Sequence, residues 1–130
     1  MISAAPANHR EFRRPPRVGT DTTYVLYITY NTMRFKWDPA KDRSNQKKHE
    51  GIDFELASRI FADPNLVIKK DRVADGEQRW HGIGTVHRGV LLVVHVYVEE
   101  NDNAQEIIRI ISARKADQHE RRIYLQQAPH

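Results

Sequence analysis

The stretch EIIRIISARKADQHERRIY, residues Glu106–Tyr124, decides the fold because it changes from strand to helix within a few residues. Isoleucines dominate its first half and predict a buried strand that ends near Lys115. Asp117 then opens a helix, and Glu120, three residues later, completes a capping-box pattern. Several fixed positive charges lie at this strand–helix corner. Such charges favour an anionic partner, and phosphate is the commonest one.

Bulk composition indicates one globular domain. The chain has 130 residues, of which 39% are hydrophobic and 29% charged, with a net charge of +4 and a pI of about 9.5. This basic excess favours nucleic acid or another anionic partner. No cysteine is present, so disulfides and thiolate metal sites are excluded. The longest apolar run, Val90–Val98, is too short to span a bilayer, and we expect a cytoplasmic protein without a membrane partner.

The beginning of the chain is expected to lie outside the folded domain. Residues 1–23 are rich in Pro, Ala, Arg and Thr and show no period of 2 or 3.6 residues, a pattern typical of disorder. A second interpretation is that Met33 is the natural start. We therefore predict a disordered or non-native extension over residues 1–33 and a domain over residues 34–130.

The predicted domain shows strand and helix signals in the order β-α-α-β-β-β-β-α. Asp38 and Pro39 predict the start of a first helix, Gly51 its end, and Asp53 the start of a second helix. Short links join the following β segments, and short links favour antiparallel pairing. We predict an α+β fold: a small antiparallel meander of four to five strands with an N-terminal helical hairpin and a C-terminal helix.

Alternation along the strands separates the two faces of the predicted sheet. Leu92, Val94, Val96 and Val98 share one face, which we expect to be core. The opposite face is expected to be basic, aromatic and able to exchange protons, which suits single-stranded RNA. Its residues are predicted to be Arg79, His81, His95, Tyr97 and, in one interpretation, Arg109.

The side chains on this second face suit RNA cleavage without a metal ion. The reaction needs a group that removes the 2′-hydroxyl proton, donors for the charged phosphorane, and an acid for the departing 5′-oxygen. Arg79, Arg109 and Arg114 are candidates for the phosphate, because guanidinium can bond two phosphate oxygens. The candidates for proton transfer are His49, His81, His95 and Glu99. The candidates for base stacking are Tyr97 and Tyr124.

Several of these residues also have a structural interpretation. Arg109 lies inside a strand and is equally well explained by an ion pair with Glu99 or Glu106. His95 in an apolar run is typical of a half-buried structural residue, and Tyr124 of helix packing. The histidines and acidic residues show no zinc or calcium spacing, so no metal and no cofactor is expected.

The chain after Met33 resembles the BrnT toxins of bacterial type II toxin–antitoxin systems. The resemblance rests on FKWDPAKDRSNQKKHEGIDFELASRIFADP (35–64), EQRWHGIG (77–84) and IRIISARKADQHERRIY (108–124). It implies a RelE-like ribonuclease domain over residues 34–130 that arrests translation. It also implies neutralisation by a BrnA-like ribbon-helix-helix antitoxin, with operator DNA contacted only through that antitoxin.

The family motifs imply further site residues. The W-D-P-x-K pattern ends at Lys41, and the K-H-G pattern begins at Lys48 and His49 but contains an inserted Glu50. The E-x-R and I-S-A-R patterns end at Arg79 and Arg114, which we predict to be the phosphate-binding pair.

Two sets of site residues are therefore predicted. The catalytic candidates are Arg79, Arg114, His81 and Glu99. The RNA-binding candidates are Lys41, Lys48, His49, Arg109, Tyr97 and Tyr124. This site requires guanidinium groups that are accessible and not neutralised by carboxylates. The alternative function is a non-catalytic subunit that assembles with a DNA-binding partner and tunes repression of the operon.

Overall fold

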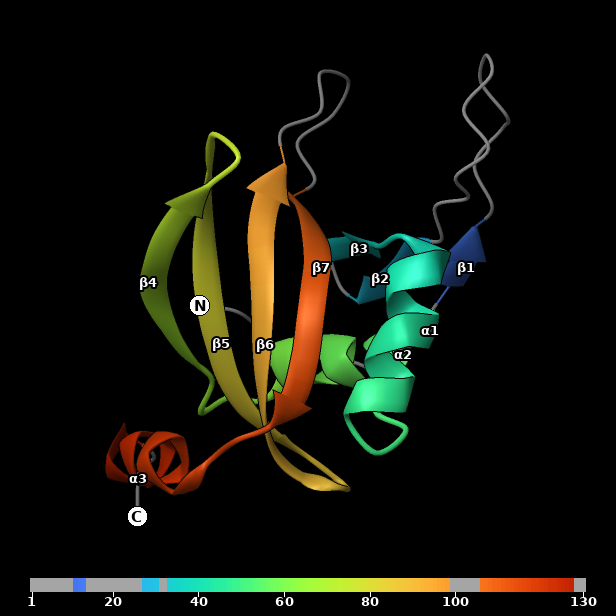
Figure 1. Ribbon diagram of the computed structural model, residues 1–130. Helices are drawn as coiled ribbons and strands as arrows, with labels where there is room; N and C mark the ends of the chain where they lie inside the picture. Colours follow the sequence, from blue (N-terminus) through green and yellow to red (C-terminus); the bar gives the residue numbers. More distant parts are fainter. Residues whose placement is uncertain (1–10, 14–26, 31–32, 99–105, 128–130) are drawn as a thin grey trace.

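The computed structural model describes residues 11–13, 27–30, 33–98 and 106–127 (Figure 1). Its strands are β1 (Glu11–Arg13), β2 (Tyr27–Tyr30), β3 (Met33–Lys36), β4 (Val67–Ala74), β5 (Glu77–Val86), β6 (Gly89–Val98) and β7 (Glu106–Lys115). Its helices are α1 (Pro39–Lys48), α2 (Phe54–Ser58), the 3-10 helix η1 (Arg59–Ala62) and α3 (Gln118–Gln127). Within these ranges, no helix has the length and apolar character needed to cross a membrane. Most of the predicted extension, residues 1–33, lies outside the described residues, so its disorder stays a prediction.

The sheet is mixed, with the strand order β1-β2-β3-β7-β6-β5-β4. Strands β4 to β7 form the predicted antiparallel meander, but β3 pairs with β7 in parallel, from Met33 opposite Glu106 to Lys36 opposite Arg109. The prediction of a purely antiparallel sheet is therefore wrong, while the α+β class is confirmed. The parallel pair is possible because the whole α1–β6 segment forms the long connection that such pairing requires.

Local signals define where both N-terminal helices begin. The carboxylate of Asp38 accepts a hydrogen bond from the N–H of Ala40 at 2.9 Å, and Pro39 occupies the first turn of α1. Asp53 caps α2 in the same way through the N–H of Leu56 at 2.8 Å. The predicted helical hairpin is not found. Helix α2 is only five residues long and continues into η1, and both α1 and α2 pack against β7.

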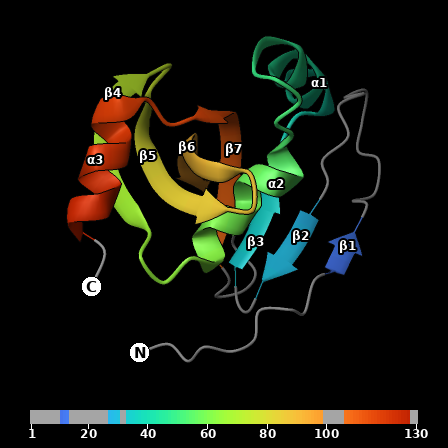
Figure 2. The same cartoon turned by 90° about the horizontal axis from the view of Figure 1, so that it is seen from below.

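Helices cover the two faces of the sheet unequally. Viewed along the strands, α2 lies on one face, whereas α3 covers only one end of the other face and α1 stands beside β7 (Figure 2). The main core lies beneath α2 and η1 and includes the buried residues Phe35, Phe54, Ile60, Leu91, Val93 and Ile110. A smaller core under α3 contains Ile83, Leu92 and Tyr124. Burial of each large apolar side chain contributes about 2 kcal/mol, so the α2–η1 side dominates the stability.

Two glycine-containing features of β5 set its position. The β4–β5 turn is Asp75-Gly76, and both residues have positive φ values, 53° and 76°, as a tight two-residue hairpin turn requires. Further along β5, a Cβ atom at Gly84 would lie 2.8 Å from the side chain of Ile60. Only glycine allows η1 to approach the sheet this closely, which fixes the face of β5 that the helices cover.

Candidate functional site

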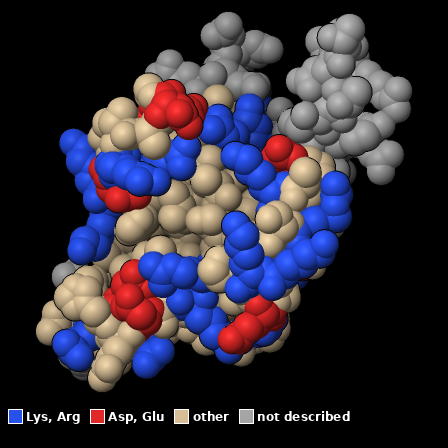
Figure 3. Space-filling view, viewed as in Figure 1, with Lys and Arg blue, Asp and Glu red and all other residues tan. Residues whose placement is uncertain are grey.

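Arginines from two strands lie on one face of the sheet, called here the arginine face. It carries Arg79 and His81 on β5 and Arg109 and Arg114 on β7, because the register pairs His81 with Val94, Arg109 with Val96 and Arg114 with Leu92. Figure 3 shows this face, on which charged side chains of both signs surround an uncharged centre. The structure therefore brings together the predicted residues Arg79, His81, Arg109 and Arg114.

The prediction assigned His95 and Tyr97 to this same face, and that assignment is wrong. Both lie on the opposite face, which α2 and η1 cover, and His95 is fully buried. Its Nδ1 lies 3.2 Å from the carbonyl oxygen of Val93, its Nε2 lies 3.2 Å from the hydroxyl of Tyr97, and its ring meets Phe61 edge-on. Burial lowers the pKa of His95 to about 4, so the ring is neutral and structural at neutral pH.

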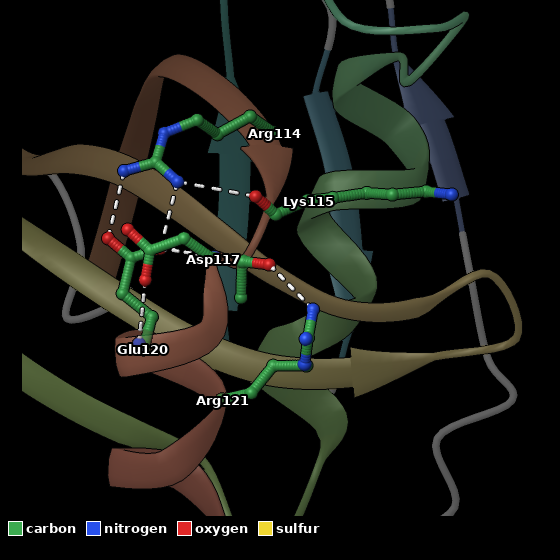
Figure 4. Close-up of polar contacts among 6 residues, drawn as sticks. Arg114, Lys115, Asp117, Glu120 and Arg121 are labelled. Carbon is green, nitrogen blue, oxygen red and sulfur yellow. Dashed lines mark hydrogen bonds and ion pairs between the residues drawn. The ribbon is translucent and has the colours of Figure 1, made fainter.

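The strand–helix corner contains a bidentate ion pair between Arg114 and Glu120 (Figure 4). Arg114 donates from Nη1 to Oε1 at 2.8 Å and from Nη2 to Oε2 at 2.9 Å. Glu120 also accepts from the N–H of Asp117 at 2.9 Å, and Asp117 accepts from the N–H of Glu120 at 2.8 Å, so the predicted capping box is confirmed. The hydrogen bond from Arg114 lowers the pKa of Glu120, which keeps the carboxylate ionised.

A second bidentate pair joins Arg109 to Glu77. Its Nη1–Oε2 and Nη2–Oε1 distances are 3.1 and 2.8 Å. The structural interpretation of Arg109 was thus correct in kind, but its partner is Glu77 of β5. The hydrogen bond from Arg109 lowers the pKa of Glu77, and the charges of Arg79 and Lys36 lower it further. Two of the three candidate phosphate arginines are therefore paired with carboxylates, contrary to the expectation of accessible guanidinium groups.

Arg79 differs from the other two arginines. Its ion partner is Asp75, whose carboxylate is 3.6 Å away and 90% exposed. Solvent screens such a pair strongly, so it neutralises little of the charge. The Nε of Arg79 is buried and has no hydrogen-bond partner within the described part of the chain. Arg79 is thus the least tightly paired of the three arginines, but its side chain is only 15% exposed, so it is also the least accessible of them.

The remaining predicted residues are distributed around this face. The Nε2 of His81 lies 3.1 Å from a carboxylate oxygen of Asp71 on β4. Glu99 falls outside the described residues, so its role stays a prediction. Tyr124 is buried in the smaller core and donates its hydroxyl to Asp63 at 2.7 Å, so its ring has no open face for a base.

Three predicted RNA-binding residues line one cavity between α1 and β7. Lys41, Lys48 and His49 contribute from the helix side and Ser112 from the strand side, around a volume of about 270 Å³. The structure thus brings Lys41, Lys48 and His49 together, and their role in binding RNA stays a prediction. Helix α1, which carries the two lysines, stands beside β7 (Figures 1 and 2).

Sequence reasoning missed Asn45, which attaches α1 to β7. Its amide nitrogen donates to the carbonyls of Ala113 at 2.8 Å and Ile52 at 3.0 Å, and its oxygen accepts from the N–H of Ala113 at 3.1 Å. Asn45 therefore satisfies both backbone groups of Ala113 as a neighbouring strand would. The available sequence signal was the helical spacing of Asn45 from Lys41 and Lys48, which puts the three residues on one side of α1. A side-chain amide that is buried there is normally fully hydrogen-bonded.

Fold and site define the class of the protein: a small α+β domain that presents basic residues suited to binding phosphate esters. A family model described as "Ribonuclease toxin, BrnT, of type II toxin-antitoxin system" matches residues 37–120. The chain belongs to this BrnT family of ribonuclease toxins, and a type II family implies an antitoxin partner. A comparison with curated proteins finds no match.

Proposed function

We propose that this protein is a metal-independent endoribonuclease toxin that arrests translation and is neutralised by a ribbon-helix-helix antitoxin. The observation that carries the proposal is Arg79, a guanidinium on the arginine face whose 3.6 Å contact with the exposed Asp75 is looser than the bidentate pairs that hold Arg109 and Arg114. Membership of a family of ribonuclease toxins supports it. The proposed domain is RelE-like, acts in the cytoplasm and reaches operator DNA only through the antitoxin.

The proposed reaction breaks a phosphodiester bond by attack of the neighbouring 2′-oxygen. The 2′-hydroxyl loses its proton to a base, the new bond to phosphorus forms a cyclic phosphate, and the departing 5′-oxygen takes up a proton. Arg79 and Arg114 contact the phosphorane oxygens, where fixed donors stabilise developing charge. His81 and Glu99 are the proposed proton carriers. Asp71 holds the Nε2 of His81, which leaves Nδ1 for the transfer.

Cleavage of RNA by the purified full chain in the presence of EDTA tests the proposal. We expect cleavage to persist in EDTA and to fall at least tenfold in Arg79→Ala, with antitoxin binding unchanged. Arg122→Ala is the matched control, since Arg122 is an exposed arginine of α3. Full activity of Arg79→Ala, or complete loss of activity in EDTA, would contradict the proposal.

The paired arginines favour a second candidate function. Because Glu77 and Glu120 hold Arg109 and Arg114, a protein that binds no RNA and only assembles with a DNA-binding partner would show the same two pairs. Such a subunit would leave RNA intact and still increase operator binding by its partner. A cleavage assay and an operator-binding assay on the same preparation separate the two functions.

A further inference from the structure

The cavity between α1 and β7 has a definite structural origin. Lys41, Ser44 and Lys48 follow a spacing of three and four residues, so they form one stripe of α1 that faces β7. Pairing of β3 with β7 ends at Lys36 opposite Arg109, and α1 takes the place beside β7 beyond that point. A register irregularity between Val94 and His95 alters the course of β7 at the same level. The cavity is thus built by regular elements on both sides.

The charge of this cavity distinguishes it from a second one of nearly equal size. The α1–β7 cavity, about 270 Å³, is lined by two lysines, a histidine, two serines, an asparagine and an isoleucine, and among the described residues no carboxylate side chain contributes to its lining. The second cavity, about 260 Å³, contains Arg59 and Arg88, but Asp53 and Glu55 line it as well. Only the first therefore concentrates positive charge without internal compensation.

Two carbonyls in the last turn of α1 accept hydrogen bonds from the backbone that follows the helix. The carbonyls of a last helical turn carry partial negative charge when they are left unbonded. Here the carbonyl of Asn45 accepts from the N–H of His49, and that of Gln46 accepts from the N–H of Gly51, both at 2.9 Å. The polar side chains that line the cavity are those of Lys41, Ser44, Asn45, Lys48, His49 and Ser112.

We propose that the α1–β7 cavity is a phosphate subsite that holds the phosphate of a nucleotide flanking the scissile bond. Lys41 and Lys48 supply the charge, and the hydroxyls of Ser44 and Ser112 supply short hydrogen bonds. A volume of about 270 Å³ is roughly nine times the volume that one water molecule occupies in the liquid, which is enough for a phosphate with its sugar. The proposal deepens the proposed function and rests on RNA being the substrate.

Ser112 connects this subsite to the arginine face. Alternation along β7 puts Ser112 on the same face as Arg114, two residues and roughly 7 Å further along the strand. One strand of RNA can therefore contact Arg114 and enter the cavity past Ser112. We assign the cavity to a neighbouring nucleotide because the arginines already occupy the central face.

Titration of the full chain with a nucleoside 3′-monophosphate and with inorganic phosphate, followed by NMR, tests the subsite. We expect the amide signals of Ser112 and His49 to shift with both probes, and a nucleoside without phosphate to leave them unchanged. Lys48→Ala should weaken binding about fivefold. Lys47→Ala is the matched control: Lys47 is the preceding residue of the same helix, is exposed and lies outside the cavity lining.

The same variants distinguish failure of the subsite from failure of the proposed function. Equal phosphate binding by Lys48→Ala and Lys47→Ala would overturn the subsite, whether or not RNA is cleaved. Selective loss in Lys48→Ala would support the subsite even if the protein cleaved no RNA, in which case the proposed function alone would fail. If Lys48→Ala weakened antitoxin binding but not phosphate binding, the cavity would be a protein-docking site and the proposal would be wrong.

Discussion

Replacing Glu120 by Gln tests how the strand–helix corner uses Arg114. In the native protein the Glu120 carboxylate bonds both terminal nitrogens of Arg114 and the N–H of Asp117. Glutamine keeps one acceptor oxygen and the capping geometry, but it presents an NH₂ donor where Arg114 also donates. The substitution therefore removes one charge and at least one charge-assisted hydrogen bond without removing the helix cap.

The expected cost follows from the geometry and exposure of the pair. Hydrogen bonds to charged groups contribute about 1.5–3 kcal/mol, but Arg114 is 38% exposed, so we expect a loss of about 1–2 kcal/mol. For a chain of this size the Tm should fall by roughly 4–8 °C. Because the folded protein lowers the pKa of Glu120, the pair stabilises the protein above the ordinary pKa of 4.5 and loses this effect as the pH falls through the lowered value. The difference between wild type and Glu120→Gln should therefore shrink below about pH 4.5.

The assay is RNA binding as a function of salt concentration. If Arg114 contacts phosphate, releasing it from Glu120 should tighten binding and steepen the slope of log K against log salt by about 0.7. Glu55→Gln is the control, because Glu55 pairs with Arg59 at 3.5 Å in an exposed pair. A lower Tm with wild-type RNA affinity and slope would refute a phosphate role for Arg114. Tighter binding with slower cleavage would identify Glu120 as a proton acceptor.

Three further predictions concern the scaffold. Asn45→Ala leaves both backbone groups of Ala113 unpaired in a buried position and should cost about 2–4 kcal/mol in a denaturant titration; a cost below 1 kcal/mol would contradict this. His95 has its pKa lowered to about 4, so wild-type stability should be complete above pH 6.5 and fall by about 2 kcal/mol between pH 7 and pH 5, whereas His95→Gln should lack this slope. Glu50 adopts a φ of 58°, so Glu50→Gly should raise the Tm by relieving about 1 kcal/mol of strain; an unchanged or lower Tm would refute it.

Local sequence patterns correctly predicted the structural features that depend only on residues close together in the chain. The Asp38 cap of α1 and the capping box of Asp117 and Glu120 are confirmed because each involves groups within one helical turn. The Asp75-Gly76 turn is an equally local signal for the β4–β5 hairpin. Side-chain alternation separated the two sets within each strand, but it assigned the Leu92–Val98 set to the core face, and that set lies on the arginine face.

Tertiary contacts, and not side-chain alternation, determine which face of the sheet the helices cover. Both faces of β6 are apolar, so its pattern does not show which face the helices cover. The close approach of Ile60 to Gly82 and Gly84 decides it, and this contact joins η1 to β5. The pairs of Arg109 with Glu77 and of Asn45 with Ala113 link residues 32 and 68 positions apart. Sequence periodicity does not report such separations, and for this reason an ion pair of Arg109 was considered but its partner Glu77 was not predicted.

The parallel pairing of β3 with β7 has a consequence for how the protein is made. Strand β3 (Met33–Lys36) finds its partner only at Glu106–Arg109, so the sheet cannot close until the ribosome has synthesised nearly all of the domain. Pairing between such distant segments is slow, because the entropy of closing the intervening loop is lost before any stabilising contact forms. The parallel β3–β7 pair therefore forms late, after the rest of the sheet has been synthesised.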